Sequence, residues 1–317
     1  MTHEFHPLPG RTSPRFSGIK TFMRLPFHEN SQDVDAMIIG VPFDSLTSFR
    51  PGARFGPSAV REATSLGRAF HWEHQISLFD SLKVCDGGDV FVNPYRDDEA
   101  FLAIQERFSA IVQGSCVPLA VGGDHSITLP ILRALKGYYN EPLALVHFDA
   151  HADTYGPAWG VDIHHGTFVR HAIDEGLIHP QKTYQIGLRG GLATGDDFAY
   201  GAQQGIKVLR AQKLHTQSWD QTVQQLETFK NEIGKQPVYL SFDVDAMDPA
   251  FAPGTGTPVP GGLSSWQAIA LIQQLKGLRI VGADVVEVTP AYDQSQITSI
   301  LAMSLLFEML GLLKKVP

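Results

Sequence analysis

Cysteine is scarce in this chain of 317 residues, which has only Cys85 and Cys116 and no pair spaced as C-x-x-C. Both cysteines lie in apolar stretches that resemble strands. Disulfide frameworks and dithiol redox motifs need other cysteine patterns, so we expect two reduced, buried thiols. The same scarcity indicates a reducing compartment.

Signals for export, membranes and nucleic acids are also lacking. The first ten residues contain no apolar signal-peptide core, and we expect no apolar run to approach the length of a membrane span. The net charge is −8, and there is no cluster of Lys and Arg. We therefore predict a cytoplasmic protein with neither a membrane nor a nucleic-acid partner. Neither a G-x-x-x-x-G-K phosphate loop nor a dinucleotide fingerprint is present.

The composition, 43% hydrophobic and 18% charged, is sufficient for a large buried core. Residues 1–34 are rich in Pro, Gly and Arg and show no regular period, so we interpret them as an N-terminal arm that packs on the body or on a neighbouring subunit. Residues 35–317 alternate between strand and helix patterns without a linker. This alternation predicts a single α/β domain with a mostly parallel sheet. An eight-stranded barrel fits the same count, and the pattern does not separate closed from open sheets.

The expected elements follow from apolar periodicity and from Gly and Pro boundaries. Eight strands are expected at residues 35–41, 82–86, 117–125, 142–148, 182–188, 206–209, 237–243 and 280–288. Helices are expected after residue 56, with Pro57 near the first turn, and at residues 97–112, 127–135, 167–175, 196–204, 216–233, 264–275 and 295–313.

The stretch LVHFDAHAD at residues 145–153 is an apolar strand that ends in ionisable groups. In an extended chain, Asp149, His151 and Asp153 point in the same direction because they occupy alternate positions. Such groups at the end of a buried strand are unfavourable without a compensating charge. A solvated loop is the alternative interpretation, but carboxylates and an imidazole at this spacing favour a set of metal ligands.

Two further strands have the same design. The stretch PVYLSFDVD at 237–245 ends in Asp243 and Asp245, and VPLAVGGDH at 117–125 ends in His125. In parallel α/β sheets, ligands bind at the carboxyl ends of strands. The combined donors are too many for one ion and fit two ions that share bridging carboxylates. Carboxylate-rich ligation without thiolate favours two Mn²⁺ per chain, and paired metals that activate water predict hydrolysis.

Three other residues are candidates for roles beside the metals. His164 and His165 lie in a loop beyond Asp153, where a histidine would either face solvent or transfer a proton to a leaving amine. Glu287 follows an apolar run in the last expected strand. It would either form a structural salt bridge or hold a cationic substrate through charge-assisted hydrogen bonds.

The motifs that carry this chemistry resemble those of the ureohydrolase family, which includes arginases, agmatinases and guanidino-acid hydrolases. They are GGDHS (122–126), FDAHAD (148–153), SFDVDAMDP (241–249), RPGARFGP (50–57), PGTGTP (253–258) and VEVTP (286–290). The resemblance extends over nearly the whole chain. It implies an open three-layer α/β/α fold, a binuclear Mn²⁺ site, hydrolysis of a guanidino group to urea and an amine, and assembly into homotrimers or homohexamers.

The resemblance also implies roles for individual residues. One manganese would be held by His125, Asp149, Asp153 and Asp243, and the other by Asp149, His151, Asp243 and Asp245. Asp149 and Asp243 would bridge the two ions. His165 matches the family's proton-shuttling histidine, and Glu287 matches the glutamate that holds the guanidinium group. His164 has no assigned counterpart.

The substrate depends on loops that contact its far end. The stretches FAPGTGT (251–257) and AYDQSQIT (291–298) resemble bacterial agmatinases, whereas the loop 155–164 is closer in length to that of guanidinobutyrate and guanidinopropionate hydrolases. Asp162, the only charged side chain of this loop besides its histidine, would attract the ammonium group of agmatine and repel a carboxylate. We therefore expect agmatine, hydrolysed to putrescine and urea, with a guanidino acid as the alternative.

Two hypotheses of other classes remain open. A related deacetylase-like amidohydrolase would use a single zinc ion, which conflicts with so many carboxylates. A metal-binding homologue with only an interaction role would be expected to lack some of the ligands, but all six positions are filled.

Overall fold

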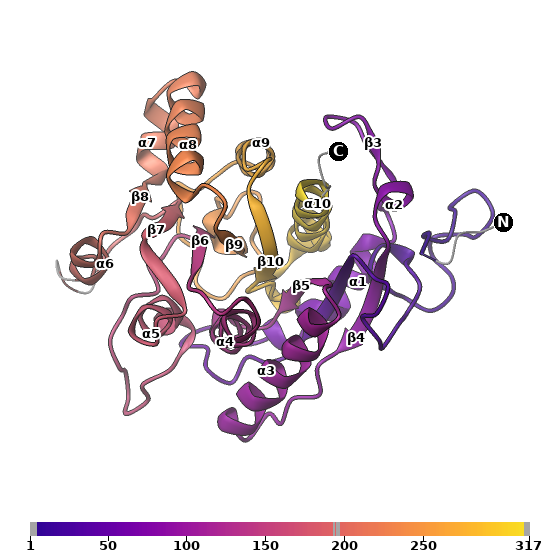
Figure 1. Cartoon of the computed structure of the whole chain (residues 1–317), viewed down its shortest axis with the longest axis horizontal. Helices are drawn as coiled ribbons and strands as arrows, with labels where there is room; N and C mark the ends of the chain where they lie inside the picture. Colours follow the sequence, from indigo (N-terminus) through magenta and orange to yellow (C-terminus); the bar gives the residue numbers. More distant parts are fainter. Residues whose placement is uncertain (1–4, 193, 195–196, 314–317) are drawn as a thin grey trace.

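The computed structural model describes residues 5–192, 194 and 197–313. An eight-stranded sheet with the order β4-β1-β5-β10-β9-β6-β7-β8 forms its centre (Figure 1). All neighbouring strand pairs of this sheet are parallel. The strands are β1 (Ala36–Val41), β4 (Val84–Asp89), β5 (Val117–Gly122), β6 (Leu143–Phe148), β7 (Ile178–Ile186), β8 (Lys207–Leu209), β9 (Pro237–Asp243) and β10 (Arg279–Val286).

The sheet is open, because β4 and β8 form its two edges. The expected three-layer α/β/α architecture is therefore confirmed, and the barrel alternative is wrong. Strands β1, β6 and β9 are buried along their full lengths. Strands covered on both faces need apolar side chains on both sides, which explains why these segments are nearly continuous apolar runs.

Helices cover both faces of the sheet (Figure 1). On one face lie α3 (Asp97–Gln113), α4 (Thr128–Tyr139) and α5 (Phe168–Asp174). On the other lie α1 (Gly56–Thr64), α8 (Trp219–Ile233), α9 (Ser265–Gln274) and α10 (Ile297–Leu312). Each helical layer contributes to its own hydrophobic core, the first with Phe108 and Ile131, the second with Phe229 and Leu305.

The remaining described α-helices and strands are short. They are α2 (Leu78–Ser81), α6 (Ala199–Gln204), α7 (Ala211–Thr216) and the antiparallel strands β2 (Phe70–His71) and β3 (Ile76–Ser77). The helix expected at 216–233 is present as α8 but begins at Trp219, because Gln217 and Ser218 are extended between α7 and α8. Ser218 instead caps α8 by accepting a hydrogen bond from the Gln221 amide. The β2–β3 hairpin, α2 and α7 were not expected, because segments this short show no periodic pattern.

The last helix corrects one expectation. The segment 294–312, which includes α10, is long and apolar enough to cross a membrane by length and composition. In its most apolar stretch of 18 residues, 61% is buried inside the protein. The expectation that no apolar run approaches span length is therefore wrong. Helix α10 packs against α1, α9 and β10. A helix enclosed on several sides needs apolar residues around most of its circumference, which explains its composition.

The N-terminal segment makes specific contacts with the sheet. Phe22 is fully buried, and its backbone N–H donates to the Asp86 carboxylate at 2.8 Å. The division into an arm of residues 1–34 and a domain of residues 35–317 remains a prediction.

A stability prediction follows from the core beside the metal-ligand segment. Phe148 at the end of β6 is fully buried and stacks on Phe242 with ring centroids 4.9 Å apart. We expect Phe148→Ala to lower the free energy of unfolding by about 3–5 kcal/mol, because it leaves a cavity that neighbouring strands do not fill. Urea unfolding followed by circular dichroism measures the change. Phe91, which is 91% exposed, provides the control, and Phe91→Ala is expected to stay within about 0.5 kcal/mol of the parent. Equal effects of the two substitutions would contradict the prediction.

Candidate metal centre

The candidate metal ligands come together because four central strands are neighbours. Strands β5, β10, β9 and β6 are adjacent in that order, and their carboxyl ends lie at one edge of the sheet. His125 follows β5, Asp149 follows β6, Asp243 ends β9, and Glu287 follows β10. All six predicted ligands lie in one cluster at this edge, as the distances below show. Their role as ligands is still a prediction.

Hydrogen bonds determine which nitrogen of His125 faces the cluster. The Ser241 hydroxyl donates to Asp284 Oδ1 at 2.7 Å, so its oxygen accepts from His125 Nε2–H at 2.8 Å. Asp284 is held in turn by Tyr239 and Thr128, whose hydroxyls donate to its other oxygen. In the neutral ring, Nδ1 of His125 therefore carries a lone pair.

That lone pair faces negative charge. His125 Nδ1 lies 3.1 Å from Asp149 Oδ2, 3.1 Å from Asp153 Oδ2 and 3.2 Å from Asp243 Oδ2. The nitrogen is buried and has no hydrogen-bond partner with suitable geometry among the described residues. A lone pair surrounded by three carboxylate oxygens is unfavourable unless a positive charge lies between them. The donor set therefore fits a cation at this point.

A second group shares Asp149. His151 Nδ1 lies 3.0 Å from Asp245 Oδ2 and 3.3 Å from Asp149 Oδ1. Asp149 thus presents Oδ2 to the first group and Oδ1 to the second. Asp243 contacts the first group through Oδ2, and its Oδ1 accepts the backbone N–H of Asp245. Two groups joined by Asp149 fit two ions better than one.

The electrostatics of the cluster agree with this geometry. Burial and the charges of Asp245 and Asp149 raise the pKa of the Asp243 carboxyl well above its ordinary value. Burial and the charge of Asp149 also raise the pKa of Asp245. Buried carboxylates this close together repel one another, and a divalent cation is the group that removes the repulsion.

His165 and Glu287 form a pair beside the cluster. His165 Nδ1 lies 3.0 Å from Glu287 Oε1, and its Nε2 lies 2.6 Å from the Ser48 hydroxyl. Burial lowers the pKa of His165, but the hydrogen bond and charge of Glu287 outweigh it and raise this pKa to about 9. A histidine whose pKa is raised in this way is suited to hold a proton and donate it.

Glu287 has one oxygen to spare. Its Oε1 accepts hydrogen bonds from the His125 backbone N–H and from His165, both at 3.0 Å. Its Oε2 is buried without a partner among the described residues. The residue also has a φ of +63°, a left-handed conformation that is uncommon for non-glycine residues and concentrates at functional sites. Buried carboxylate oxygens are normally hydrogen-bonded, so a ligand with an N–H or O–H donor would provide the partner that Glu287 Oε2 lacks.

His164 has a different task from His165. Its Nδ1 accepts the backbone N–H of Gly166, and its Nε2–H donates to the Gly156 carbonyl, both at 3.2 Å. Burial lowers the pKa of His164, so the ring is neutral at physiological pH. Both nitrogens therefore hold the loop, and of the two neighbouring histidines only His165 contacts Glu287.

A cavity of about 180 Å³ opens over the cluster. This volume is below the 300–1,000 Å³ of typical clefts for drug-sized ligands and suits a small molecule. Its lining consists of Ser48, His151, Asp153, Tyr155, His164, His165, Gly166, Asp243 and Thr257. Asp162 does not line this cavity. It is exposed in a separate surface groove with Asp97, Asp98 and Arg133, so the fold separates it from the metal-ligand cluster.

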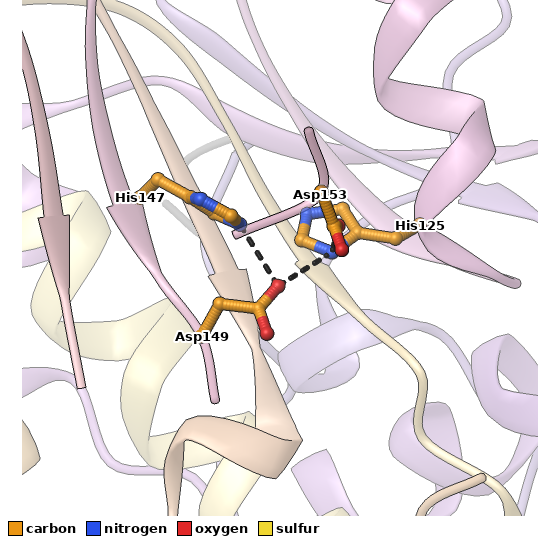
Figure 2. A group of neighbouring side chains, drawn as sticks. All are labelled: His125, His147, Asp149 and Asp153. Carbon is orange, nitrogen blue, oxygen red and sulfur yellow. Dashed lines mark hydrogen bonds and ion pairs between the residues drawn. The ribbon is translucent and has the colours of Figure 1, made fainter. Parts of the chain in front are cut away.

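The sequence interpretation missed His147. This histidine is fully buried in β6, and its Nε2 lies 2.9 Å from Asp149 Oδ2 (Figure 2). A ring nitrogen of His147 and ligand atoms of His125, Asp149 and Asp153 all lie within 4.8 Å of one another, which is close enough for one metal ion. Its position two residues before Asp149 was the available signal, because alternate strand residues face the same side. A histidine inside an apolar run is nevertheless easily taken for a core residue.

Comparisons with known proteins agree with the fold. Residues 34–311 match the model of the arginase family. The chain is 43% identical over 311 residues to a guanidinobutyrase of Pseudomonas aeruginosa, which covers 97% of this chain and 96% of the relative. It is 44% identical to a mitochondrial agmatinase of Gallus gallus, with 93% and 86% covered. The solved proclavaminate amidino hydrolase of Streptomyces clavuligerus superposes with a TM-score of 0.89 at 41% identity, covering 95% of this chain and 99% of that one. The chain therefore belongs to the arginase family.

Proposed function

We propose that this arginase-family hydrolase cleaves the guanidino group of a small linear compound to urea and an amine, with two Mn²⁺ per chain. The observation that carries the proposal is the buried, unpartnered Oε2 of Glu287 beside the carboxylate cluster. A guanidinium group presents several N–H donors in one plane, and a carboxylate oxygen is their natural acceptor.

The chain's own residues then have distinct tasks. His125, Asp149, Asp153 and Asp243 would hold one ion, and Asp149, His151, Asp243 and Asp245 the other. When bound, two such ions lower the pKa of water and supply a nucleophile at neutral pH. Glu287 holds and orients the guanidinium group, and His165, hydrogen-bonded to Glu287, supplies the proton that the departing amine needs.

The choice of Mn²⁺ rests on the donor atoms. The two groups offer carboxylate oxygens and imidazole nitrogens. The two cysteines, Cys85 and Cys116, lie in the core around β1 and β5 and belong to neither group. Oxygen-rich ligation without sulfur suits Mn²⁺ better than copper or a structural zinc ion. Two groups that share Asp149 also argue against a deacetylase-like hydrolase with one zinc.

For the far end of the substrate, we propose a carboxylate, which makes the substrate an ω-guanidino acid. Arg50 stands two residues from Ser48 of the cavity and contacts the rings of Phe49 and Tyr292. A Cβ built on Gly256 would lie 3.2 Å from the Arg50 carbonyl oxygen and 3.5 Å from Glu287 Oε2, so this loop borders the free carboxylate oxygen. Arg50 has no ion pair with a described residue and remains available to a carboxylate.

Agmatine is the second candidate. The sequence favoured it through Asp162, but the cavity lining includes no carboxylate apart from the two candidate ligands Asp153 and Asp243. The relatives are divided as well. Guanidinobutyrase and proclavaminate amidino hydrolase are named for acids, and the avian relative is named for agmatine. Because Asp162 does not line the cavity, it no longer favours agmatine, and we propose the guanidino acid instead.

We also propose that copies of the chain associate, as trimers or hexamers, in the cytoplasm. Phe16 and Ile19 of the N-terminal segment are 86% and 92% exposed, and large apolar side chains at such exposure support contact with another copy.

The substrate proposal is tested by urea release from the Mn²⁺-loaded protein with 4-guanidinobutyrate, 3-guanidinopropionate, agmatine, arginine and free guanidine. We expect kcat/KM to be highest for a guanidino acid. We further expect Arg50→Gln to raise KM for that acid about 10-fold, by loss of a charge-assisted hydrogen bond, and to leave agmatine turnover unchanged. Agmatine far ahead of both acids would overturn the acid proposal. No urea from any compound would overturn the proposed function.

The guanidinium contact predicts the effect of Glu287→Gln. Because the substitution removes the charge of the acceptor and keeps its shape, we expect kcat/KM to fall about 10- to 100-fold. Steady-state kinetics with the best substrate measure the change. Asp162→Asn, which also removes one carboxylate charge but lies exposed in the separate surface groove, is the matched control and is expected to leave kcat/KM unchanged. If Asp162→Asn lowered kcat/KM as much as Glu287→Gln, the prediction would be wrong and Asp162 would contribute to substrate binding.

Metal removal provides an independent prediction. We expect dialysis against a chelator to abolish urea release and to lower Tm, because repulsion among the buried carboxylates is no longer offset. Added Mn²⁺ should restore both, with two ions per chain by elemental analysis. One ion per chain at full activity would contradict the two-ion site.

A further inference from the structure

Behind the candidate metal centre lies a pair of fully buried polar side chains, His147 on β6 and Gln185 on β7. The two residues are directly paired in the register of the parallel strands. His147 contacts Asp149, the residue shared by both ligand groups. Neither His147 nor Gln185 has a task in the function proposed above.

The hydrogen bonds of Gln185 determine its orientation. The carbonyl oxygen of Ala152 can only accept, and it lies 2.7 Å from the Gln185 side-chain nitrogen. That nitrogen therefore faces Ala152, and its second hydrogen is directed to His147 Nδ1 at 3.0 Å. Both N–H groups of the amide are then used.

This orientation determines the tautomer of His147. Because Nδ1 accepts from Gln185, the ring proton of the neutral imidazole is on Nε2. Nε2–H then donates to Asp149 Oδ2 at 2.9 Å (Figure 2). The ring is also fixed sterically, since it packs edge-on against Phe168 with centroids 5.2 Å apart.

The same reasoning separates His147 from the ligands. A ligand needs a lone pair directed at the ion, and both nitrogens of His147 are engaged, one as acceptor and one as donor. His125 is the opposite case, because its hydrogen bond to Ser241 leaves the lone pair of Nδ1 toward the carboxylates. Two neighbouring histidines therefore have opposite tasks, one to bind and one to donate.

We propose that His147, oriented by Gln185, is a positioning residue that donates a hydrogen bond to Asp149 and so fixes the plane of the carboxylate shared by both ion sites. The inference rests on the two-ion site of the proposed function. His147 holds Oδ2 of Asp149 by this hydrogen bond. The remaining lone pair of Asp149 Oδ2 then faces the group of His125, and Asp149 Oδ1 stays directed at His151. Partners of this kind, one shell behind the ligands, typically affect metal affinity or activity 10- to 100-fold.

Two substitutions at position 147 separate donation from simple packing. In His147→Asn, the side-chain amide ends near the position of Nδ1, so it keeps a partner for Gln185 but does not reach Asp149. In His147→Gln, the longer side chain places an N–H near the position of Nε2 and can restore the donor. Gln185→Met tests the orientation from the other side, because it keeps the volume and removes both amide donors.

The experiment is a Mn²⁺ titration of the metal-free, full-length protein, with free Mn²⁺ measured by electron paramagnetic resonance. For His147→Asn we expect two ions per chain and a Kd for the more weakly bound Mn²⁺ that is raised about 10- to 100-fold. We also expect a weaker electron paramagnetic resonance signal from the magnetically coupled pair of Mn²⁺ ions. We expect kcat to fall by a similar factor while KM changes less than about threefold. His147→Gln should recover most of the affinity, and Gln185→Met should weaken it in the same direction.

Two results would overturn the proposal. One ion per chain in His147→Asn at saturating Mn²⁺ would make His147 a ligand. Unchanged affinity and kcat in His147→Asn would leave it without a positioning role. If His147→Asn does not fold, as judged by circular dichroism, Gln185→Met decides the question, and unchanged Mn²⁺ affinity and kcat in that variant would overturn the positioning role. Because the titration needs no substrate, a loss of Mn²⁺ affinity without any urea release from the parent protein would support His147 and refute only the proposed function.

Discussion

The repulsion among buried carboxylates is the constraint on which this structure depends. Asp149, Asp153, Asp243 and Asp245 are each at most 4% exposed and converge with two imidazoles at one edge of the sheet. Such a cluster is unfavourable unless cations offset it, so the fold must hold the groups in place for that purpose. An open parallel sheet provides the rigidity, because its central strands are fixed by hydrogen bonds on both sides and by a packed helical layer on each face.

A polar network inside the core directs the cluster. Asp284 accepts from Ser241, Ser241 accepts from His125, and the result is a lone pair aimed at the cluster. Gln185 and His147 work in the opposite sense and aim a proton at Asp149. The hydrogen bonds behind the cluster are satisfied and leave His125 Nδ1 as the one atom of these two networks without a partner among the described residues, which gives the site a single arrangement.

Much of the fold and site could be predicted from local patterns. The alternation of strands and helices predicted eight strands, and strand ends such as Asp149 and Asp243 predicted the ligands, because side-chain direction in a strand follows from sequence parity. The tail of the substrate could not be predicted in this way. Asp162 lies in the loop between the cluster and His165, yet it faces a different groove, because the path of a loop depends on packing against distant elements.

The sequence by itself determined which residues end each strand, and therefore the chemistry available at the carboxyl edge of the sheet. Only the tertiary structure decided which strands are neighbours, because pairing such as β5 with β10 joins segments more than 150 residues apart in the chain. It also decided the roles of the histidines. The sequence presents His125, His147, His164 and His165 as equivalent imidazoles, but their partners Ser241, Gln185, Gly156 and Glu287 make them different. Which ring nitrogen carries the proton depends on these contacts across the fold, and no local pattern contains them.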